Sequence, residues 1–80
     1  MDWKTETKLK FAEHLLALME AYAKANPNDK NSLRALAARS GLEPSHVQRI
    51  AKGKVDVAMT TLFSLAEGLK ISPKELLDFK

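Results

Sequence analysis

The stretch LAARSGLEPSHVQRIAKGK, residues 36–54, carries the signals for two short helices joined by a tight turn. Gly41 stands where a left-handed C-terminal cap would end the first of them. Glu43 can cap the second helix, and Pro44 suits its first helical position. That helix should run to Lys52. We therefore predict that the middle of the chain folds as helix, turn and helix.

The segment before this stretch is predicted to form one long helix and the start of the next. Its apolar residues recur at spacings of four, three and four, on one helical face: Phe11, Leu15, Leu18 and Tyr22. Leu16 and Met19 are expected to widen this face. Pro27 disfavours helical backbone at the residue before it, so the helix should end near Ala25. Ser32 is a suitable N-cap for the short helix that follows.

The segment after residue 54 is predicted to add two further helices. The first has apolar residues at helical spacing: Leu62, Leu65, Ala66 and Leu69. The second begins with Ser72, Pro73 and Glu75, which together make a capping box with proline in the first turn. Five helices joined by short turns in 80 residues predict one all-α domain, a compact five-helix bundle over residues 1–80.

The composition excludes several classes of protein. The chain has no cysteine, so we expect no disulfide and no thiolate metal site. His14 and His46 lie far apart in the sequence, and no metal or other cofactor is expected. The longest apolar run, residues 15–19, is too short to cross a bilayer, and no secretory signal opens the chain. We expect a cytoplasmic location and, because no catalytic constellation is visible, no enzyme activity.

Positive charge is concentrated in one segment. Residues 1–31 carry five lysines and five acids, and residues 55–80 carry three lysines and four acids. Residues 32–54 carry five basic residues and one acid, Glu43. A basic patch of this kind indicates either an anionic partner such as nucleic acid or an ordinary solvated face.

The predicted helix over 44–52 has two unlike sides. At 100° per residue, its polar side chains fall within an arc of about 140°: Ser45, Gln48, Arg49 and Lys52. Its apolar side chains lie opposite, at Val47, Ile50 and Ala51, with His46 at the border. A face of hydrogen-bonding and cationic groups fits the DNA major groove, where arginine and glutamine make two-pronged contacts to base edges.

The pattern of residues 36–54, followed by LFSLAEGLKISPKELL at 62–77, resembles the phage repressor/Cro-type (XRE-type) helix-turn-helix family. The resemblance covers about residues 9–79. It implies a fold of the lambda-repressor-like DNA-binding type and a sequence-specific transcriptional regulator that acts as a homodimer on double-stranded DNA. A Cro-like repressor, a restriction–modification controller and an antitoxin all remain open.

The resemblance also implies a set of DNA-contacting positions. Ser45 and Arg49 match the main base-reading positions, and Gln48 neighbours them. Pro44 offers only apolar contact, and Lys54 matches a phosphate-contact position. The full set is Ser32, Arg34, Pro44, Ser45, His46, Gln48, Arg49, Lys52, Lys54, Thr60 and Thr61.

Three residues depart from the family pattern. Leu33 stands where a phosphate-contacting glutamine is frequent, Ala51 where glutamate is frequent, and Glu43 where serine or threonine usually caps. The missing glutamine and the added acid should weaken DNA binding. The alternative function is a protein-interaction module of the same fold, or an antitoxin-like partner binder, with weak or no DNA binding.

The end segments have more than one interpretation. Trp3 is expected to pack under the bundle or against a second subunit. Leu76, Leu77 and Phe79 are expected either to enter the core or to form part of a dimer seam.

Overall fold

The first helix, α1 (Trp3–Ala25), is the longest element of the computed structural model, which describes residues 2–80. It begins where the Asp2 carboxylate accepts a hydrogen bond from the backbone N–H of Thr5, at 2.8 Å. It ends one residue before Asn26, as the following proline predicts. Its buried face consists of Phe11, Ala12, Leu15, Met19 and Tyr22.

The two central helices form as predicted. In α2 (Leu33–Ser40), the Ser32 hydroxyl accepts a hydrogen bond from the backbone N–H of Ala35 at 3.0 Å. Gly41 ends α2 in the left-handed conformation, with φ 69°, which glycine adopts without the Cβ clash. The helix α3 (Pro44–Ala51) follows after a turn of residues 41–43.

One capping prediction is wrong. Glu43 occupies the N-cap position of α3, but its side chain makes no capping hydrogen bond. Its carbonyl still accepts the N–H of His46 and the N–H of Val47, each at 3.1 Å. Serine, threonine, asparagine and aspartate reach those N–H groups easily, whereas the longer glutamate side chain is a poor cap. The helix also ends one residue earlier than predicted, with Lys52 as its C-cap.

The last two helices complete the bundle. The helix α4 (Met59–Leu69) ends at Lys70, which takes the left-handed conformation with φ 57°. The short α5 (Pro73–Leu76) begins with the predicted capping box between Ser72 and Glu75.

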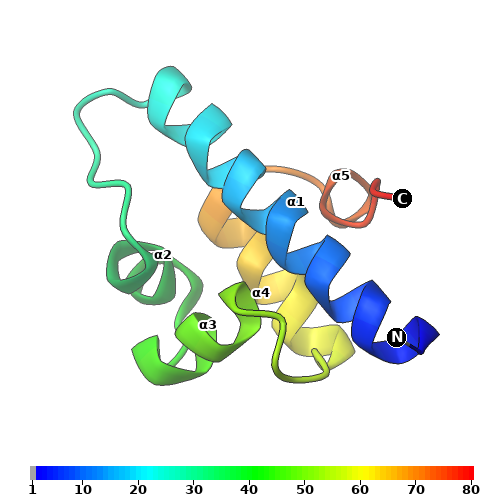
Figure 1. The fold of residues 1–80 in the computed structure, drawn as a ribbon. Coiled ribbons are helices and arrows are strands. Elements are labelled where there is room, and N and C mark those ends of the chain that lie inside the picture. Colours follow the sequence, from blue (N-terminus) through cyan, green and yellow to red (C-terminus); the bar gives the residue numbers. More distant parts are fainter. Residues whose placement is uncertain (1) are drawn as a thin grey trace.

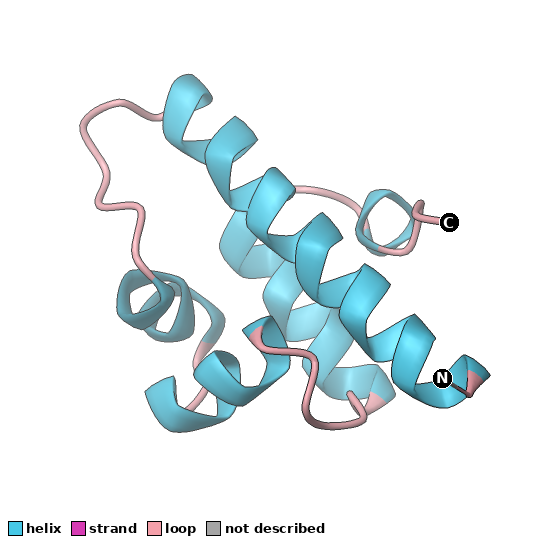
Figure 2. Ribbon diagram, viewed as in Figure 1, coloured by secondary structure: helices cyan, strands magenta, loops and turns pink. Residues whose placement is uncertain are grey.

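The helices enclose one apolar core. In Figure 1, α1 crosses in front of α4, with α2 and α3 on one side and α5 on the other. Figure 2 shows helices and connecting loops throughout the described residues. The largest fully buried side chains come from all five helices: Leu15, Leu36, Val47, Ile50, Leu65 and Leu76.

The exposed fractions decide between some of the alternatives left open for the end segments, and they place Leu16 outside the core. Trp3 is 71% exposed in the first turn of α1, so it does not pack under the bundle. Leu16 is 46% exposed because its neighbour Leu15 takes the core-facing side of the helix. Leu76 is core, and Phe79 packs on Phe11 with ring centroids 5.6 Å apart, whereas Leu77 is 50% exposed.

Candidate nucleic-acid interface

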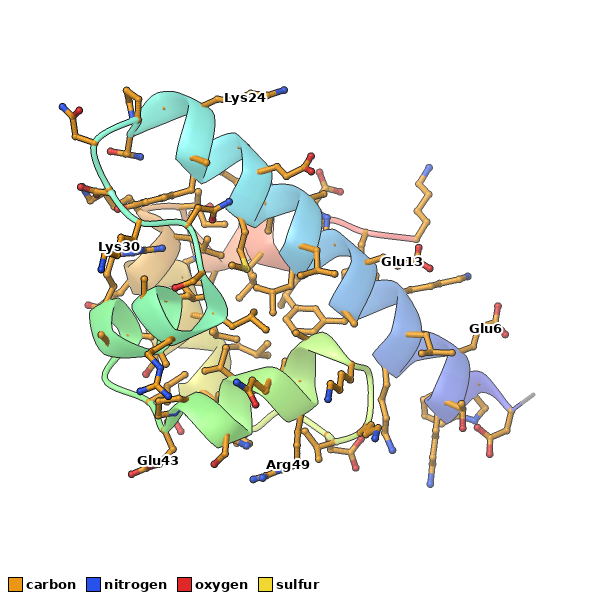
Figure 3. The ribbon with its side chains drawn as sticks, turned by 60° about the vertical axis from the view of Figure 1, so that its left-hand side comes forward. Glu6, Glu13, Lys24, Lys30, Glu43 and Arg49 are labelled. Atoms are coloured by element: carbon orange, nitrogen blue, oxygen red, sulfur yellow. The ribbon has the colours of Figure 1, made fainter. Side chains whose placement is uncertain are left out.

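The exposed side of α3 is the centre of the candidate interface. Val47 and Ile50 are fully buried and anchor the helix to the core. The polar side chains on the other side are all exposed: Ser45, Gln48, Arg49 and Lys52. Figure 3 shows Arg49 extending away from the bundle, with Glu43 along the same edge. The predicted division of α3 into an apolar and a polar side is therefore present in the structure.

The turns on both sides of α3 hold it in place. Before the helix, the N–H of Leu42 bonds to the carbonyl of Ala37 at 2.9 Å, and the Leu42 side chain packs against the core. After the helix, Gly53 takes a left-handed conformation with φ 71° and lies directly against Leu9 of α1. A Cβ at position 53 would clash with Leu9, so only glycine lets the chain pass this close to α1.

The remaining predicted site residues surround α3. Figure 1 places α3, the loop after it and the start of α4 along one edge of the molecule, with α2 beside α3. Outside α3, four predicted residues are exposed: Ser32, Arg34, Lys54 and Thr60. Three predicted residues are half-buried: Pro44 and His46, which belong to α3, and Thr61 on α4. Thr60 and Thr61 belong to the first turn of α4, where backbone N–H groups lack intrahelical acceptors.

The basic side chains of this edge have no acidic partner. Arg34, Arg49 and Lys52 form no salt bridge with any residue from 2 to 80, and neither does Lys54. Their charges are free to neutralise an external anion. Glu43 is exposed and unpaired in the same part of the chain, so it opposes that attraction.

Arg39 contributes to the fold instead of the basic edge. It belongs to the basic segment by sequence, but its Nε donates to the carbonyl of Gly68 at 2.8 Å. Its Nη1 donates to the carbonyl of Lys30 at 3.1 Å, and its guanidinium lies 4.0 Å from the centroid of the Tyr22 ring. These partners are distant in sequence, so no local spacing signals the role.

The departures from the family pattern have different structural consequences. Leu33 and Ala51 are half-buried and pack against the core, where they stabilise α2 and α3. Neither offers a hydrogen bond to an external group. The Glu43 side chain is exposed and makes no capping hydrogen bond, so its acidic group acts mainly on what approaches α3.

The histidines and acids do not form a metal site among residues 2–80. His14 is committed to the fold: its Nε2 lies 3.0 Å from the carbonyl of Glu75, and its ring lies 5.7 Å from that of Phe79. In the same residues, no helix combines the length and apolar character that crossing a bilayer requires.

Comparison with known proteins extends this description. A family model described as helix-turn-helix matches residues 29–76, which include α2 through α5. The crystal structure of the restriction-modification controller protein C.AhdI from Aeromonas hydrophila is similar, with a TM-score of 0.72. The two are 29% identical, and the similarity covers 90% of this chain and 98% of that one. No curated protein matches the chain. The likeness to C.AhdI confirms the predicted all-helical fold.

Proposed function

Since this chain belongs to the helix-turn-helix family, we propose that it is a sequence-specific DNA-binding regulator of transcription that acts as a homodimer. The observation that carries the proposal is the two-sided α3. Its apolar side is fully buried at Val47 and Ile50, and its hydrogen-bonding and cationic side is free. A helix held in this way can enter a major groove without disturbing the core.

In this proposal, three side chains of α3 read bases. Arg49 has the planar fork that makes two hydrogen bonds to guanine, and Gln48 can pair in the same two-pronged way with adenine. Ser45, in the first turn, donates to or accepts from a base edge. Pro44 has only apolar atoms to offer, which suits a thymine methyl group.

Phosphate contacts surround these bases. Arg34, Lys52 and Lys54 provide exposed positive charge. Ser32, His46, Thr60 and Thr61 supply further polar groups, and the first turn of α4 supplies free N–H groups. Contacts to phosphate fix the position of the protein on the duplex but carry no sequence information.

A homodimer is supported by apolar groups that the single chain leaves uncovered. Met59 is 73% exposed and Phe63 55% exposed, both on α4, and Leu77 after α5 is 50% exposed. Phe63 also lines a shallow groove with Ile71 and Pro73. A second copy that covers these groups would give a dimer with two α3 helices. To read the two halves of a two-fold symmetric DNA site, such helices lie about 34 Å apart.

The similarity to a restriction-modification controller protein favours a controller among the regulators of this fold. The protein-interaction module is the second candidate, because Glu43 is acidic and unpaired beside the basic side chains. In that case the same edge would bind a protein, and DNA would be repelled by Glu43.

One experiment separates these functions. Binding to random-sequence duplex DNA is measured at two salt concentrations, and preferred sites are then selected from a random pool. We expect affinity to fall steeply with salt, because phosphate contacts release counterions, and we expect a two-fold symmetric consensus. No binding at low salt, or a pool without a consensus, would favour the protein-interaction module.

A further inference from the structure

Arg39 joins three segments that are separate in the sequence. It lies in the last turn of α2 and bonds through Nε to α4 at Gly68. Through Nη1 it bonds to the loop before α2, at Lys30. Its guanidinium also lies against the ring of Tyr22 in α1, at 4.0 Å.

The contact with α4 satisfies a group that the helix itself leaves open. Gly68 lies one residue before the end of α4, where carbonyls have no intrahelical donor. The carbonyls of Ala66 and Glu67 accept N–H groups from the following turn, whereas that of Gly68 accepts from Arg39. The positive guanidinium also interacts favourably with the negative end of the helix dipole.

The contact with α1 rests on a ring that is itself fixed. The Tyr22 hydroxyl donates to a carboxylate oxygen of Asp29 at 2.6 Å, and this hydrogen bond raises the pKa of Tyr22. Asp29 and Lys30 belong to the loop that leads into α2. The stacked ring and the Lys30 carbonyl therefore tie both the loop and the end of α2 to α1.

The end of α2 is also where the orientation of α3 is determined. Only residues 41–43 separate the two helices. Side chains of α2 pack so closely on α4 that a Cβ at Gly68 would collide with the Ser40 hydroxyl and press on Leu36. A shift of α2 at this point would carry α3 with it, because the short turn transmits the displacement.

We propose that Arg39 is a positioning residue for DNA recognition: it holds α2 so that α3 presents its polar side correctly, and it does not itself contact DNA. This inference rests on the proposed DNA-binding function. The side chain must be arginine, because one planar fork donates in two directions and stacks on a ring at the same time. Lysine keeps the charge but cannot make this combination of contacts.

The experiment compares Arg39→Lys with Arg34→Met on the same helix and with Lys24→Arg on α1. Arg34 is exposed on α2, and its side chain makes no hydrogen bond or salt bridge with residues 2–80, so Arg34→Met is the reference for the loss of one phosphate contact. We expect Arg39→Lys to lower affinity for the selected site about tenfold, with the salt dependence unchanged. Lys24→Arg should bind as the unmodified protein does, because Lys24 on α1 is outside the proposed interface. Arg34→Met should lose affinity on all DNA with a shallower salt dependence, because it removes a phosphate contact.

The ratio of specific to non-specific affinity distinguishes positioning from loss of folded protein. Partial unfolding lowers both affinities by the same factor. Misplacement of α3 lowers affinity for the selected site more than affinity for random DNA. If Arg39→Lys binds the selected site like the unmodified protein, or loses both affinities equally, the proposal is wrong.

A second readout needs no DNA. Hydrogen exchange of the free protein should become faster in residues 29–42 of Arg39→Lys, and stay slow in the middle of α1. Unchanged exchange would overturn the claim that Arg39 holds α2, whereas failure of the unmodified protein to bind DNA would overturn only the proposed function.

If Arg39→Lys does not fold, Tyr22→Phe replaces it in the experiment. This variant keeps the ring that Arg39 contacts but removes the hydrogen bond to Asp29, so it loosens only the loop. We expect a smaller loss of affinity for the selected site and a smaller rise in exchange; exchange and affinity equal to those of the unmodified protein would count against the proposal.

Discussion

At the scale of single residues, the candidate interface has four exposed basic side chains and one exposed acidic side chain. Arg34, Arg49, Lys52 and Lys54 are exposed without acidic partners among residues 2–80, and Glu43 is exposed at the start of α3. Arg39, which the sequence counts with the basic segment, points into the fold. Affinity for DNA is therefore adjustable by single substitutions at these positions, in either direction.

Arg49 is expected to determine sequence preference. Arg49→Ala should cost about 1–3 kcal/mol of binding free energy at the selected site and little on random DNA, because a base contact is lost. Titration of labelled duplexes measures both. Lys24→Ala is the control, since Lys24 lies at the far end of α1 from Arg49 (Figure 3). An equal loss on every duplex would show that Arg49 contacts phosphate only.

Glu43 is expected to oppose DNA binding and to cap α3 poorly. Glu43→Ser should strengthen binding to all DNA by removing a negative charge from the approach to α3. Serine also caps better, so the free energy of unfolding should rise by about 0.5–2 kcal/mol. Glu13→Ser removes an equal charge from α1, which Figure 3 shows on another side. If both variants gain DNA affinity equally, net charge and not position is responsible.

At the scale of helices, the capping signals were the most dependable part of the sequence. Ser32, Gly41 and the Ser72–Glu75 box stand at the helix ends where they were predicted. These signals are local: a side chain and an N–H three residues apart suffice. The prediction that Glu43 caps α3 was wrong, because side-chain length decides whether an acid reaches the N–H groups at the start of the helix. A pattern of polar residues does not take that length into account.

Contacts between helices were not predictable in the same way. The partners of Arg39 lie 29 residues away at Gly68 and nine away at Lys30, and no periodicity relates them. The polar side of α3 was predicted because 3.6-residue periodicity alone separates Gln48 and Arg49 from Val47 and Ile50.

The packing of α2 on α4 predicts the behaviour of two glycine variants. Gly68→Ala should destabilise the fold by about 1–3 kcal/mol, because its Cβ meets Ser40, although alanine favours helices. Gly41→Ala has open space around its Cβ and should lose stability only through left-handed backbone strain, by about 1 kcal/mol. Urea unfolding of both variants measures the free energy of unfolding. If Gly68→Ala is as stable as the unmodified protein, the close approach of α2 and α4 is not rigid.

At the scale of the whole molecule, a small core and uncovered apolar groups occur together. Among residues 2–80, thirteen hydrophobic residues are buried and six large ones are exposed. Among the six, Met59 and Phe63 lie on α4 and Leu77 directly follows α5. Phe63 lines a groove together with Ile71 and Pro73, and contiguous apolar surface is typical of a face that another molecule covers.

This arrangement predicts a dimer that depends on Phe63. Sedimentation of the unmodified chain should show a concentration-dependent dimer, and Phe63→Asp should shift it to monomer, because a buried unpaired carboxylate is costly in an apolar interface. The circular dichroism of Phe63→Asp should remain helical, since the side chain is half exposed in the single chain. Leu16→Asp, which changes a similarly exposed leucine on α1, should leave the dimer intact.

The same pair of variants also connects assembly to DNA binding. A monomer occupies one half of a two-fold site and loses the advantage of two linked contacts. Phe63→Asp should therefore bind the full site much more weakly than the unmodified protein does, whereas its affinity for an isolated half-site should stay the same. Because Phe63 lies on α4 and the side chains of α3 are unchanged, a loss confined to the full site has no explanation in base reading. If Phe63→Asp remains dimeric, or binds the full site as tightly as Leu16→Asp does, the two copies do not meet through the exposed side of α4.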